Sequence, residues 1–429
     1  MDPLITLLGS FLLLVALKVP IVLTFVISSA LTILQMGMPL TSVPNHIFGG
    51  INSFPLLAVP FFLLLGQLMN YGGITEKLIT FADKLLGHIR GGLGHVNVAV
   101  SMLFAGLSGS SVADTAGVGS MLIPAMARAG YPPAYTAAIT AASSTLGGII
   151  PPSIIMVIYG SLARVSIGAL FLAGFVPGLL IGLMQMSYTY YFATKIGMER
   201  KARAPVIEMI KSFLVAFPPL LLPIIIIGGV VGGFFTATEA AAVAVVFGFF
   251  LLFVAYRSVS IKEIPGVMGR AMVGYSLPMM AVSCAGIFGW LIAYLDAPEM
   301  VVQFIYNITE APGGIRLLII AFLLLLGLIL SPIVTVTVFL PILLALGEAA
   351  GMGPLHLGII TVLTLSVGRV TPPYGICLLV ASQIAEVPNH KVFVAALPMI
   401  IGTIIIIIVG TFFSDLFLFV PKLMMPEYM

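Results

Sequence analysis

Apolar runs about as long as a membrane crossing recur along the whole chain, separated by short polar junctions. A helix needs roughly 20 mostly apolar residues to cross the hydrocarbon core of a bilayer. The runs IRLLIIAFLLLLGLIL and MIIGTIIIIIVGTFFSDLFLF are two examples. The period-2 alternation that marks the strands of an outer-membrane barrel is absent. The pattern predicts an all-α polytopic membrane protein.

Composition supports this fold class, because 60% of the 429 residues are hydrophobic and only 8% are charged. A soluble domain carries roughly 25% charged residues. The first apolar run begins at Leu4 without a basic region or a cleavage signature, so we expect a spanning helix and not a signal peptide. Cys284 and Cys377 lie far apart in apolar surroundings, which favours core positions over a disulfide or a metal site.

The chain contains an internal repeat, in which residues 147–178 align without a gap with residues 368–399. The identical pairs are Gly147 and Gly368, Pro151 and Pro372, Pro152 and Pro373, Ser161 and Ser382, and Pro177 and Pro398. A repeat of this kind indicates a fold built from related units. We therefore divide the chain into two halves, 1–206 and 207–429.

The basic residues indicate how the two halves are oriented, because Lys and Arg gather in cytoplasmic loops. They are frequent in the junctions 74–95, 195–211 and 257–270, and absent from 38–52, 229–239 and 296–313. Threading helices through these junctions predicts a periplasmic N-terminus, a cytoplasmic 195–211 loop and a periplasmic C-terminus. The halves then have inverted topologies, an arrangement typical of secondary transporters.

One long apolar stretch in each half is interrupted by small and polar residues, which predicts a re-entrant helical hairpin. A second stretch in each half is interrupted by Pro-Pro, which predicts a broken transmembrane helix. Non-helical backbone at this depth is tolerated only where it is buried in protein or lines a cavity. In order, each half contains scaffold helices, an amphipathic arm helix at the membrane surface (76–91; 298–309), the hairpin (92–129; 314–349) and the broken helix (131–162; 355–385).

Polar residues at the first hairpin turn and the first helix break are candidate Na⁺ ligands. Hydroxyls and freed backbone carbonyls at a helix break form oxygen-only sites that suit hard cations. Asp114 is the only acidic residue in the hairpin, and a carboxylate within a membrane is costly and usually functional. Alternatively, these residues only cap the two half-helices. The predicted first Na⁺ site comprises Ser108, Ser110, Ser111, Asp114, Ser143, Ser144 and Gly147.

A similar oxygen cluster in the second half predicts a second Na⁺ site. Its members are Ser331, Thr335, Thr337, Ser366, Gly368 and Thr371. Single hydroxyls in transmembrane helices more often pack or bond to the preceding turn. The prediction therefore depends on their clustering at the hairpin turn and the helix break.

Arg369 stands out because its partner in the repeat is Gly148, so the symmetry of the halves does not require it. A guanidinium binds a carboxylate through two parallel hydrogen bonds and stays charged. We expect it to anchor an anionic substrate between the two Na⁺ sites. The alternative is an internal ion pair or a contact with carbonyls at the helix break. The predicted substrate contacts are Arg369, Ser110, Thr145 and Pro372.

Nothing in the sequence indicates an enzyme. There is no His-Glu-x-x-His motif, the five histidines are scattered, and Gly91-Gly92-Leu93-Gly94 does not follow a strand. The serines of the hairpin turn lack the histidine or paired acid that would activate a nucleophile. We expect the lipid bilayer and an anionic small molecule as partners, and no nucleic acid.

Four ordered motifs resemble the large membrane subunit of tripartite ATP-independent periplasmic (TRAP) transporters, and the likeness covers essentially the whole chain. They are FAGLSGSSVADTAGVGSMLIPAM, AASSTLGGIIPPSI, GGFFTATEAAAVAV and GRVTPPYG. The resemblance implies an elevator-type secondary transporter, similar to the ion-transporter superfamily, in the bacterial inner membrane. It implies import driven by Na⁺ of a carboxylate such as sialic acid or a C4-dicarboxylate. Arg369 departs from the family pattern, in which this position is commonly apolar.

The resemblance also implies partner proteins. A small four-helix membrane subunit is expected as a separate chain, since none precedes Met1, and a soluble periplasmic binding protein is expected to deliver the substrate. The hairpins and broken helices would form the moving transport domain. A stand-alone divalent-anion/Na⁺ symporter of similar architecture is the alternative transporter, and an ion channel or a structural membrane scaffold is the alternative class.

Overall fold

The computed structural model describes residues 2–428, and within this range the chain forms 20 α-helices and no β-strand. The first ten are α1 (Pro3–Ala16), α2 (Ile21–Gln35), α3 (Ser42–Ile51), α4 (Ala58–Tyr71), α5 (Ile74–Leu86), α6 (Gly92–Ser108), α7 (Ser111–Arg128), α8 (Pro133–Ser144), α9 (Ile154–Ala163) and α10 (Ile167–Lys195). The others are α11 (Val206–Val231), α12 (Ala237–Phe250), α13 (Ile264–Tyr294), α14 (Ala297–Tyr306), α15 (Pro312–Ile329), α16 (Pro332–Ala349), α17 (Pro354–Gly368), α18 (Ile376–Ala385), α19 (Asn389–Phe412) and α20 (Ser414–Met424).

Five short helices connect these elements. The 3-10 helices are η1 (Phe54–Leu57), η2 (Thr145–Gly148), η4 (Ile261–Glu263) and η5 (Pro426–Tyr428), and η3 (Leu251–Ala255) is a π-helix. Eight helical stretches of the described chain are long and apolar enough to cross a bilayer. They are Phe54–Tyr71, Ile167–Lys195, Val206–Val231, Ala237–Ala255, Ile261–Tyr294, Pro312–Ile329, Pro332–Ala349 and Asn389–Phe412. The prediction of an all-α polytopic membrane protein is confirmed.

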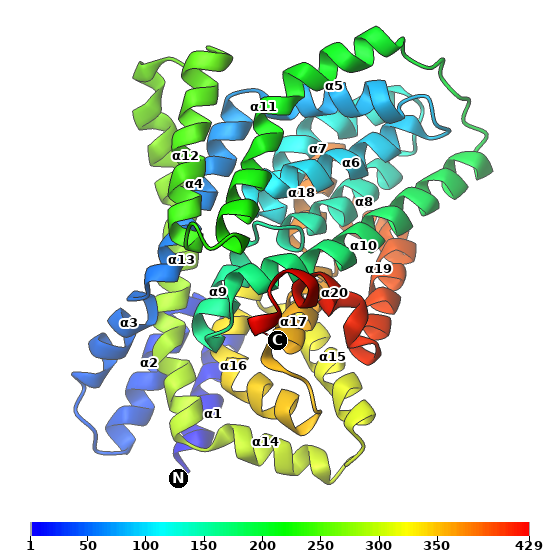
Figure 1. Cartoon of the computed structure of the whole chain (residues 1–429). Coiled ribbons are helices and arrows are strands. Elements are labelled where there is room, and N and C mark those ends of the chain that lie inside the picture. Colours follow the sequence, from blue (N-terminus) through cyan, green and yellow to red (C-terminus); the bar gives the residue numbers. More distant parts are fainter. Residues whose placement is uncertain (1, 429) are drawn as a thin grey trace.

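The order of elements in α4–α10 recurs in α13–α19. In each series a first helix (α4 or α13) is followed by a short one (α5 or α14), a tightly turned pair (α6–α7 or α15–α16), two helices separated by a break (α8–α9 or α17–α18) and a long last helix (α10 or α19). Figure 1 shows α5 and α14 at opposite ends of the molecule. The two series interlock, because α18 packs against α7 and α8 while α9 packs against α16.

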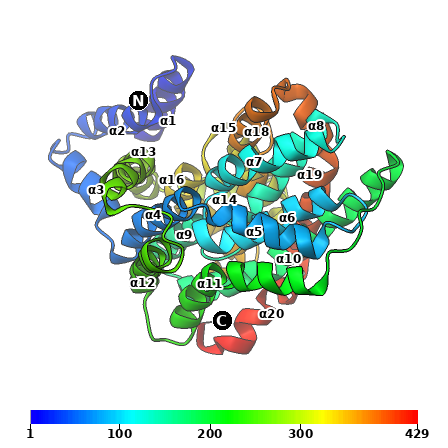
Figure 2. The same cartoon turned by 90° about the horizontal axis from the view of Figure 1, so that it is seen from above.

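Viewed from above, α1, α2, α3, α12 and α13 gather on one side of the molecule, and α8, α18 and α19 lie on the other (Figure 2). The first group is joined by contacts of α13 with α2 and α3. Its centre holds the rings of Phe11, Phe25 and Phe288, whose centroids lie 5.0 to 5.4 Å apart. Aromatic packing of this kind adds to apolar burial. The interlocked helices of the two series lie beside this group.

The short helices before each pair differ at their ends from the predicted arm ranges. α5 spans Ile74–Leu86 instead of 76–91, because the chain turns at Gly87 and adopts a left-handed conformation at Gly91 (φ +79°). α14 spans Ala297–Tyr306 instead of 298–309. α5 is amphipathic as predicted, and the buried side of the helix includes Ile74 and Leu78.

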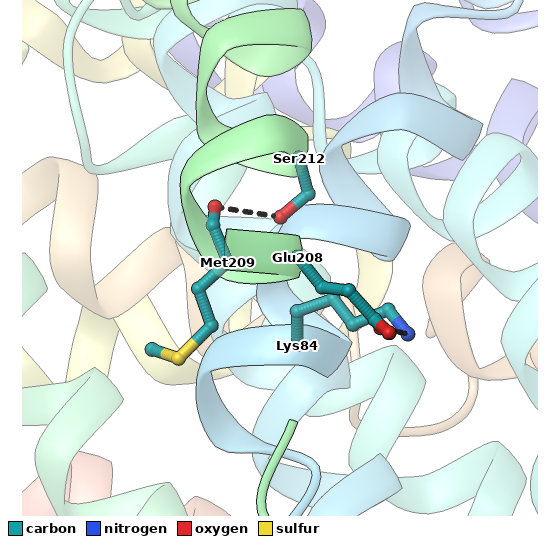
Figure 3. A network of polar contacts seen from close by, with 4 residues as sticks. All are labelled: Lys84, Glu208, Met209 and Ser212. Atoms are coloured by element: carbon teal, nitrogen blue, oxygen red, sulfur yellow. Dashed lines mark hydrogen bonds and ion pairs between the residues drawn. The ribbon is translucent and has the colours of Figure 1, made fainter. Parts of the chain in front are cut away.

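An ion pair ties α5 to α11. Nζ of Lys84 on α5 lies 2.7 Å from Oε2 of Glu208 on α11 (Figure 3). One turn further along α11, the Ser212 hydroxyl donates to the Met209 carbonyl. The two charged side chains are 36% and 47% exposed. The hydrogen bond to Glu208 and the attraction of its carboxylate hold the pKa of Lys84 above its ordinary value.

We expect Lys84→Met to lower the thermal unfolding midpoint of the purified protein slightly and in a salt-dependent way, because exposed ion pairs contribute little and salt screens them. Since the folded-state pKa of Lys84 is raised, the contribution is present below the ordinary lysine pKa and is lost as pH rises through the raised value. The control is Lys211→Met, because Lys211 lies on α11 near Glu208 and forms no ion pair within the described chain. A loss of midpoint that high salt leaves unchanged would contradict this assignment.

Candidate functional site

The first helical pair turns at a short non-helical link between α6 and α7. α6 ends at Ser108, Gly109 is left-handed (φ +60°), and Ser110 is extended (φ −129°). The Ser110 hydroxyl accepts a hydrogen bond from the backbone N–H of Ala113 (3.4 Å) and so caps α7. A Cβ at Gly109 would lie 2.7 Å from the Pro152 carbonyl oxygen, so glycine serves both the conformation and the close approach.

The first break lies directly beside this turn. α8 continues into η2, and helical structure resumes only after Ser153, whose hydroxyl caps α9. A Cβ at Gly147 would lie 3.1 Å from the backbone nitrogen of Ser111. The Ser111 hydroxyl donates to the Thr145 carbonyl (3.5 Å). The first turn and the first break are therefore in contact.

Asp114 lies inside a cluster of buried polar side chains. It is fully buried, and neither carboxylate oxygen has a hydrogen-bond partner of good geometry among residues 2–428. The hydroxyls of Ser101 and Ser144 flank the carboxylate. Ser101 contacts Ser143 (Oγ–Oγ 3.0 Å), which donates to Oδ1 of Asn97 (3.0 Å). A buried carboxylate among hydroxyl oxygens is an arrangement that a small cation would complete.

Two further polar residues, Asn97 and Ser101, belong to this cluster without being among the predicted ligands, and a third, Gln185, forms a hydrogen bond beside it. Asn97, Ser101 and Gln185 are fully buried, and Gln185 donates to the Ala142 carbonyl (3.1 Å). Asn97, Ser101 and Ser108 are spaced four and seven residues apart, which places side chains on one face of a helix. That spacing is a signal in the sequence. No such signal surrounds Gln185, which lies on α10.

The second helical pair meets the second break in a similar way. The hydroxyl of Ser331 caps the start of α16. Gly368, the last residue of α17, lies against Gly327 of α15 with no room for a side chain. The N–H of Tyr374 in the break donates to the Leu328 carbonyl of α15 (3.0 Å). In both breaks the peptide bond between the two prolines is cis.

Most predicted ligands of the second Na⁺ site lie around this contact. Thr335 and Ser366 are buried, and Thr371 is half-buried. Their hydroxyls donate to carbonyls one turn earlier: Thr335 to Ser331 (3.1 Å), Ser366 to Val362 (2.8 Å) and Thr371 to Val367 (2.9 Å). A hydroxyl bonded in this way keeps lone pairs for another partner. Thr337 differs, because its carbonyl lies against Gly289 of α13.

The remaining predicted site residues are distributed between the two breaks. Ser108 and Thr145 are buried at the first turn and the first break, while Ser110 is half-buried. Ser108 packs against α4, where a Cβ at Gly66 would lie 3.0 Å from the serine Cβ. Pro372 is exposed at the second break. Ser108, Ser110 and Thr145 therefore lie at the first turn and the first break, while Pro372 lies at the second break.

Arg369 links the two halves of the chain. It caps α17 and is only 9% exposed, and its Nη1 donates to the hydroxyl of Ser111 on the first hairpin turn. It forms no ion pair with any residue in the described chain. An uncompensated charge at such depth is costly unless it has a functional partner. The contact with Ser111 places this charge beside the predicted first Na⁺ site.

Comparison with known proteins decides the family. The family described as "Tripartite ATP-independent periplasmic transporter, DctM component" matches residues 8–416. The chain belongs to this family. The resemblance drawn from the four sequence motifs is confirmed, and the DctM component is the large permease subunit of a TRAP transporter.

Three relatives of this DctM chain carry different substrate names. The sialic acid TRAP transporter large permease protein SiaM of Vibrio cholerae is 37% identical over 92% of this chain and 93% of its own length. The C4-dicarboxylate TRAP transporter large permease protein DctM of Pseudomonas aeruginosa has the same identity and coverage. The isethionate TRAP transporter permease protein DctMQ of Oleidesulfovibrio alaskensis is 35% identical over 96% of this chain, which spans 65% of that protein.

Membership in the DctM family has two consequences. The chain is a multi-pass transporter permease and not an enzyme, as predicted from the sequence. A DctM component is by definition one part of a tripartite assembly, so the family favours the tripartite reading over a stand-alone symporter.

Gly148 of this DctM chain holds the position in the first half that Arg369 holds in the second. A Cβ at Gly148 would lie 2.8 Å from Nη1 of Arg369 and 3.4 Å from Oγ of Ser111. Real side chains do not approach so closely, so the guanidinium occupies space that only glycine leaves open. The arginine of one half thus packs against its own counterpart in the other.

We expect Gly148→Ala to destabilise the protein by about 1–3 kcal/mol, the range for overpacking a tight site, because it pushes the guanidinium away from Ser111. The thermal midpoint of the purified protein measures this. In an Arg369→Ala background the same substitution should be nearly neutral. Gly228→Ala, at a helical glycine with nothing within 4 Å of its Cβ position, is the matched control. Equal losses at Gly148 with and without Arg369 would refute the contact.

Proposed function

We propose that this DctM chain imports a small organic oxyanion, a carboxylate of the sialic acid or C4-dicarboxylate class, coupled to two Na⁺ ions. The proposal rests on the contact between the two halves of the chain. Each hairpin turn packs against a helix break, and Arg369 of the second half donates to Ser111 of the first. Broken helices at the centre of a transporter supply carbonyls for cations and helix ends for anions. The guanidinium of Arg369 supplies the positive group that pairs with the anionic substrate.

The substrate class is supported by chemistry and by the relatives. Their names refer to sialic acid, C4-dicarboxylate and isethionate, all small organic anions. Arginine pairs with such oxyanions through parallel hydrogen bonds. Arg369 uses only Nη1 in the contact with Ser111 and has no acidic partner in the described chain, so its other donors stay available for the anion.

The two Na⁺ ions occupy the predicted oxygen clusters. The first is held near Asp114 and the hydroxyls around it, and the second near Ser366 and Thr371 at the second break. Moving one negative charge inward against an inside-negative potential costs about 2.3 kcal/mol per 100 mV. Two Na⁺ ions more than offset a monoanion such as sialic acid, so its inward transport is electrogenic, whereas they just balance the charge of a dicarboxylate dianion.

Arg369 couples the anion to the first Na⁺. Its guanidinium bonds the Ser111 hydroxyl, which is also a predicted ligand of that ion. A cation next to the guanidinium is repelled, and the repulsion is strong where the dielectric is low. A bound oxyanion neutralises the arginine and draws it from Ser111, so Na⁺ binds well only when substrate is present.

Translocation follows an elevator mechanism in two inverted repeats. The recurring element order and the placement of α5 and α14 at opposite ends support the inverted relation (Figure 1). The moving domain comprises the hairpins α6–α7 and α15–α16 with the broken helices α8–α9 and α17–α18, whose helices interlock across the halves. A unit joined in this way moves as one body, which carries both ion sites together.

The transporter works in the bacterial inner membrane with two partners, a small four-helix membrane subunit and a soluble periplasmic binding protein that delivers the anion. The family's tripartite composition supports both. The DctMQ relative, of which this chain spans 65%, supports a membrane partner. Both termini of the chain lie in the periplasm.

We expect uptake into proteoliposomes, measured with the small membrane subunit, the binding protein and radiolabelled sialic acid or succinate, to require an inward Na⁺ gradient. An inside-negative potential should accelerate the uptake of sialic acid, because two Na⁺ ions and one monoanion bring in net positive charge. It should have little effect on succinate, a dianion whose charge two Na⁺ ions just balance. Replacing Na⁺ by K⁺ on both sides is the control. Uptake that continues unchanged in K⁺ would overturn Na⁺ coupling.

We expect Arg369→Ala to reduce that uptake to background and Arg369→Lys to recover only part of it, because lysine cannot make two parallel bonds to an oxyanion. Size-exclusion profile and thermal midpoint establish that the variants remain folded. Arg128→Gln, at the exposed end of α7, is the matched control and should transport normally. Wild-type uptake by Arg369→Ala would leave the arginine a structural role.

A further inference from the structure

A basic pocket lies away from the contact between Arg369 and Ser111. Its volume is about 390 Å³, in the range of small-molecule sites. We call it the Arg164–Arg316 pocket. The residues that line it are Arg164, Val165, Ser166, Arg316, Gly351, Gly353, Pro354, Leu355, His356, Ser414, Leu418 and Tyr428.

The arginine and carboxylate content of the lining gives this pocket a positive charge. Two arginines and no Asp or Glu occur among the lining residues. Asp415, next to the lining residue Ser414, is paired with Lys422, and this ion pair holds the pKa of Asp415 below its ordinary value. No acidic side chain in the lining therefore neutralises the arginines.

Three helices start at the pocket wall. Ser166 is the N-cap of α10, Gly353 is the N-cap of α17, and Ser414 is the first residue of α20. The first N–H groups of a helix have no partner within the helix, and its N-terminus carries a partial positive charge. Gly353 provides no side-chain cap for α17. The helix ends add backbone donors to the charge of the arginines.

The two arginines present their donors differently. Arg316 is fixed by the carbonyls of Ala350 (3.1 Å), Thr411 (3.4 Å) and Gly351 (3.5 Å), which take one hydrogen bond from each nitrogen. A guanidinium has five N–H donors, so two remain. Arg164 is exposed at the end of α9 in a left-handed conformation (φ +56°), with no hydrogen bond or ion pair recorded in the described chain. One arginine is held by three carbonyls and the other has no polar partner within the described chain.

The pocket is distinct from the candidate substrate site. Both are attached to α17, which has 15 residues and therefore spans about 22 Å at 1.5 Å per residue. Gly353 and Pro354 at its N-terminus line the pocket, and Arg369 caps its C-terminus. A small anion held in the pocket cannot touch Arg369.

We propose that the Arg164–Arg316 pocket binds an oxyanion, a carboxylate or a phosphate, as a second anion site apart from Arg369. The Arg316 donors, the unpartnered Arg164 and the three helix N-termini are the chemistry that recognises such groups. The oxyanion comes either from a soluble carboxylate or from the headgroup phosphate of an anionic phospholipid. The proposal is independent of Na⁺ coupling, so its failure would leave the proposed function intact.

The test uses the whole purified chain in nanodiscs, in an Arg369→Ala background that removes the other anion site. One arm measures retention of phosphatidylglycerol by native mass spectrometry from mixed phosphatidylcholine and phosphatidylglycerol discs. The other arm titrates succinate and inorganic phosphate into phosphatidylcholine discs by calorimetry. Saturable binding in the first arm identifies the anionic lipid as the ligand. Saturable binding in the second arm identifies the soluble anion as the ligand.

Arg164→Gln should weaken whichever binding is found by about tenfold, the effect of losing one charge-assisted hydrogen bond. Ser414→Asp places a carboxylate inside the pocket at a helix N-terminus, where it is tolerated, and should abolish binding. Arg128→Gln, an exposed arginine outside the pocket, is the matched control and should change nothing. Absence of binding in both arms, or binding that Arg164→Gln and Ser414→Asp leave unchanged, would overturn the proposal.

Discussion

In hydrocarbon, every backbone N–H and C=O must find a partner inside the protein, and the centre of this permease depends on how it meets that constraint. The helices stop at Ser108 and Gly368, where lipid could not satisfy the freed groups. Each stop is therefore packed against another: Gly147 lies against the backbone of Ser111, and the N–H of Tyr374 bonds the Leu328 carbonyl. Because each end is satisfied by a second end, turns and breaks come in contacting pairs, and oxygen atoms gather where they meet.

The same constraint explains why Arg369 can be buried without an acidic partner. Its N–H groups need acceptors, and the nearest polar element is the first hairpin turn, which offers the Ser111 hydroxyl. Reaching that turn requires Gly148, since any side chain there would collide with the guanidinium. The two halves share a fold pattern but differ at this pair of positions. The asymmetry lets one half place a charge inside the other.

The sequence predicts well those features that depend on local chemistry. Ser110 and Ser331 cap the returning helices near the predicted turns, and Pro-Pro marks both breaks. The arm helix α5 ends earlier than predicted because the glycine turn after Leu86 outweighs its amphipathic pattern. Contacts between distant residues could not be predicted: Gln185 of α10 bonds the Ala142 carbonyl of α8, and Arg369 meets Ser111 across 258 positions. Local patterns carry no information on such pairings, and the Na⁺ ligands stay predictions.

One helix connects the proposed sites. The C-terminal carbonyls of α17 form the negative end of its dipole, and Arg369 sits as the cap of that end. These carbonyls are the groups that the proposed second Na⁺ would need. A cation at the second break must therefore share the helix end with a permanent positive charge. An oxyanion on Arg369 relieves that competition, as it relieves the competition at Ser111. A single arginine between the two proposed cation sites would make both depend on the anion, which is the property that a symporter requires.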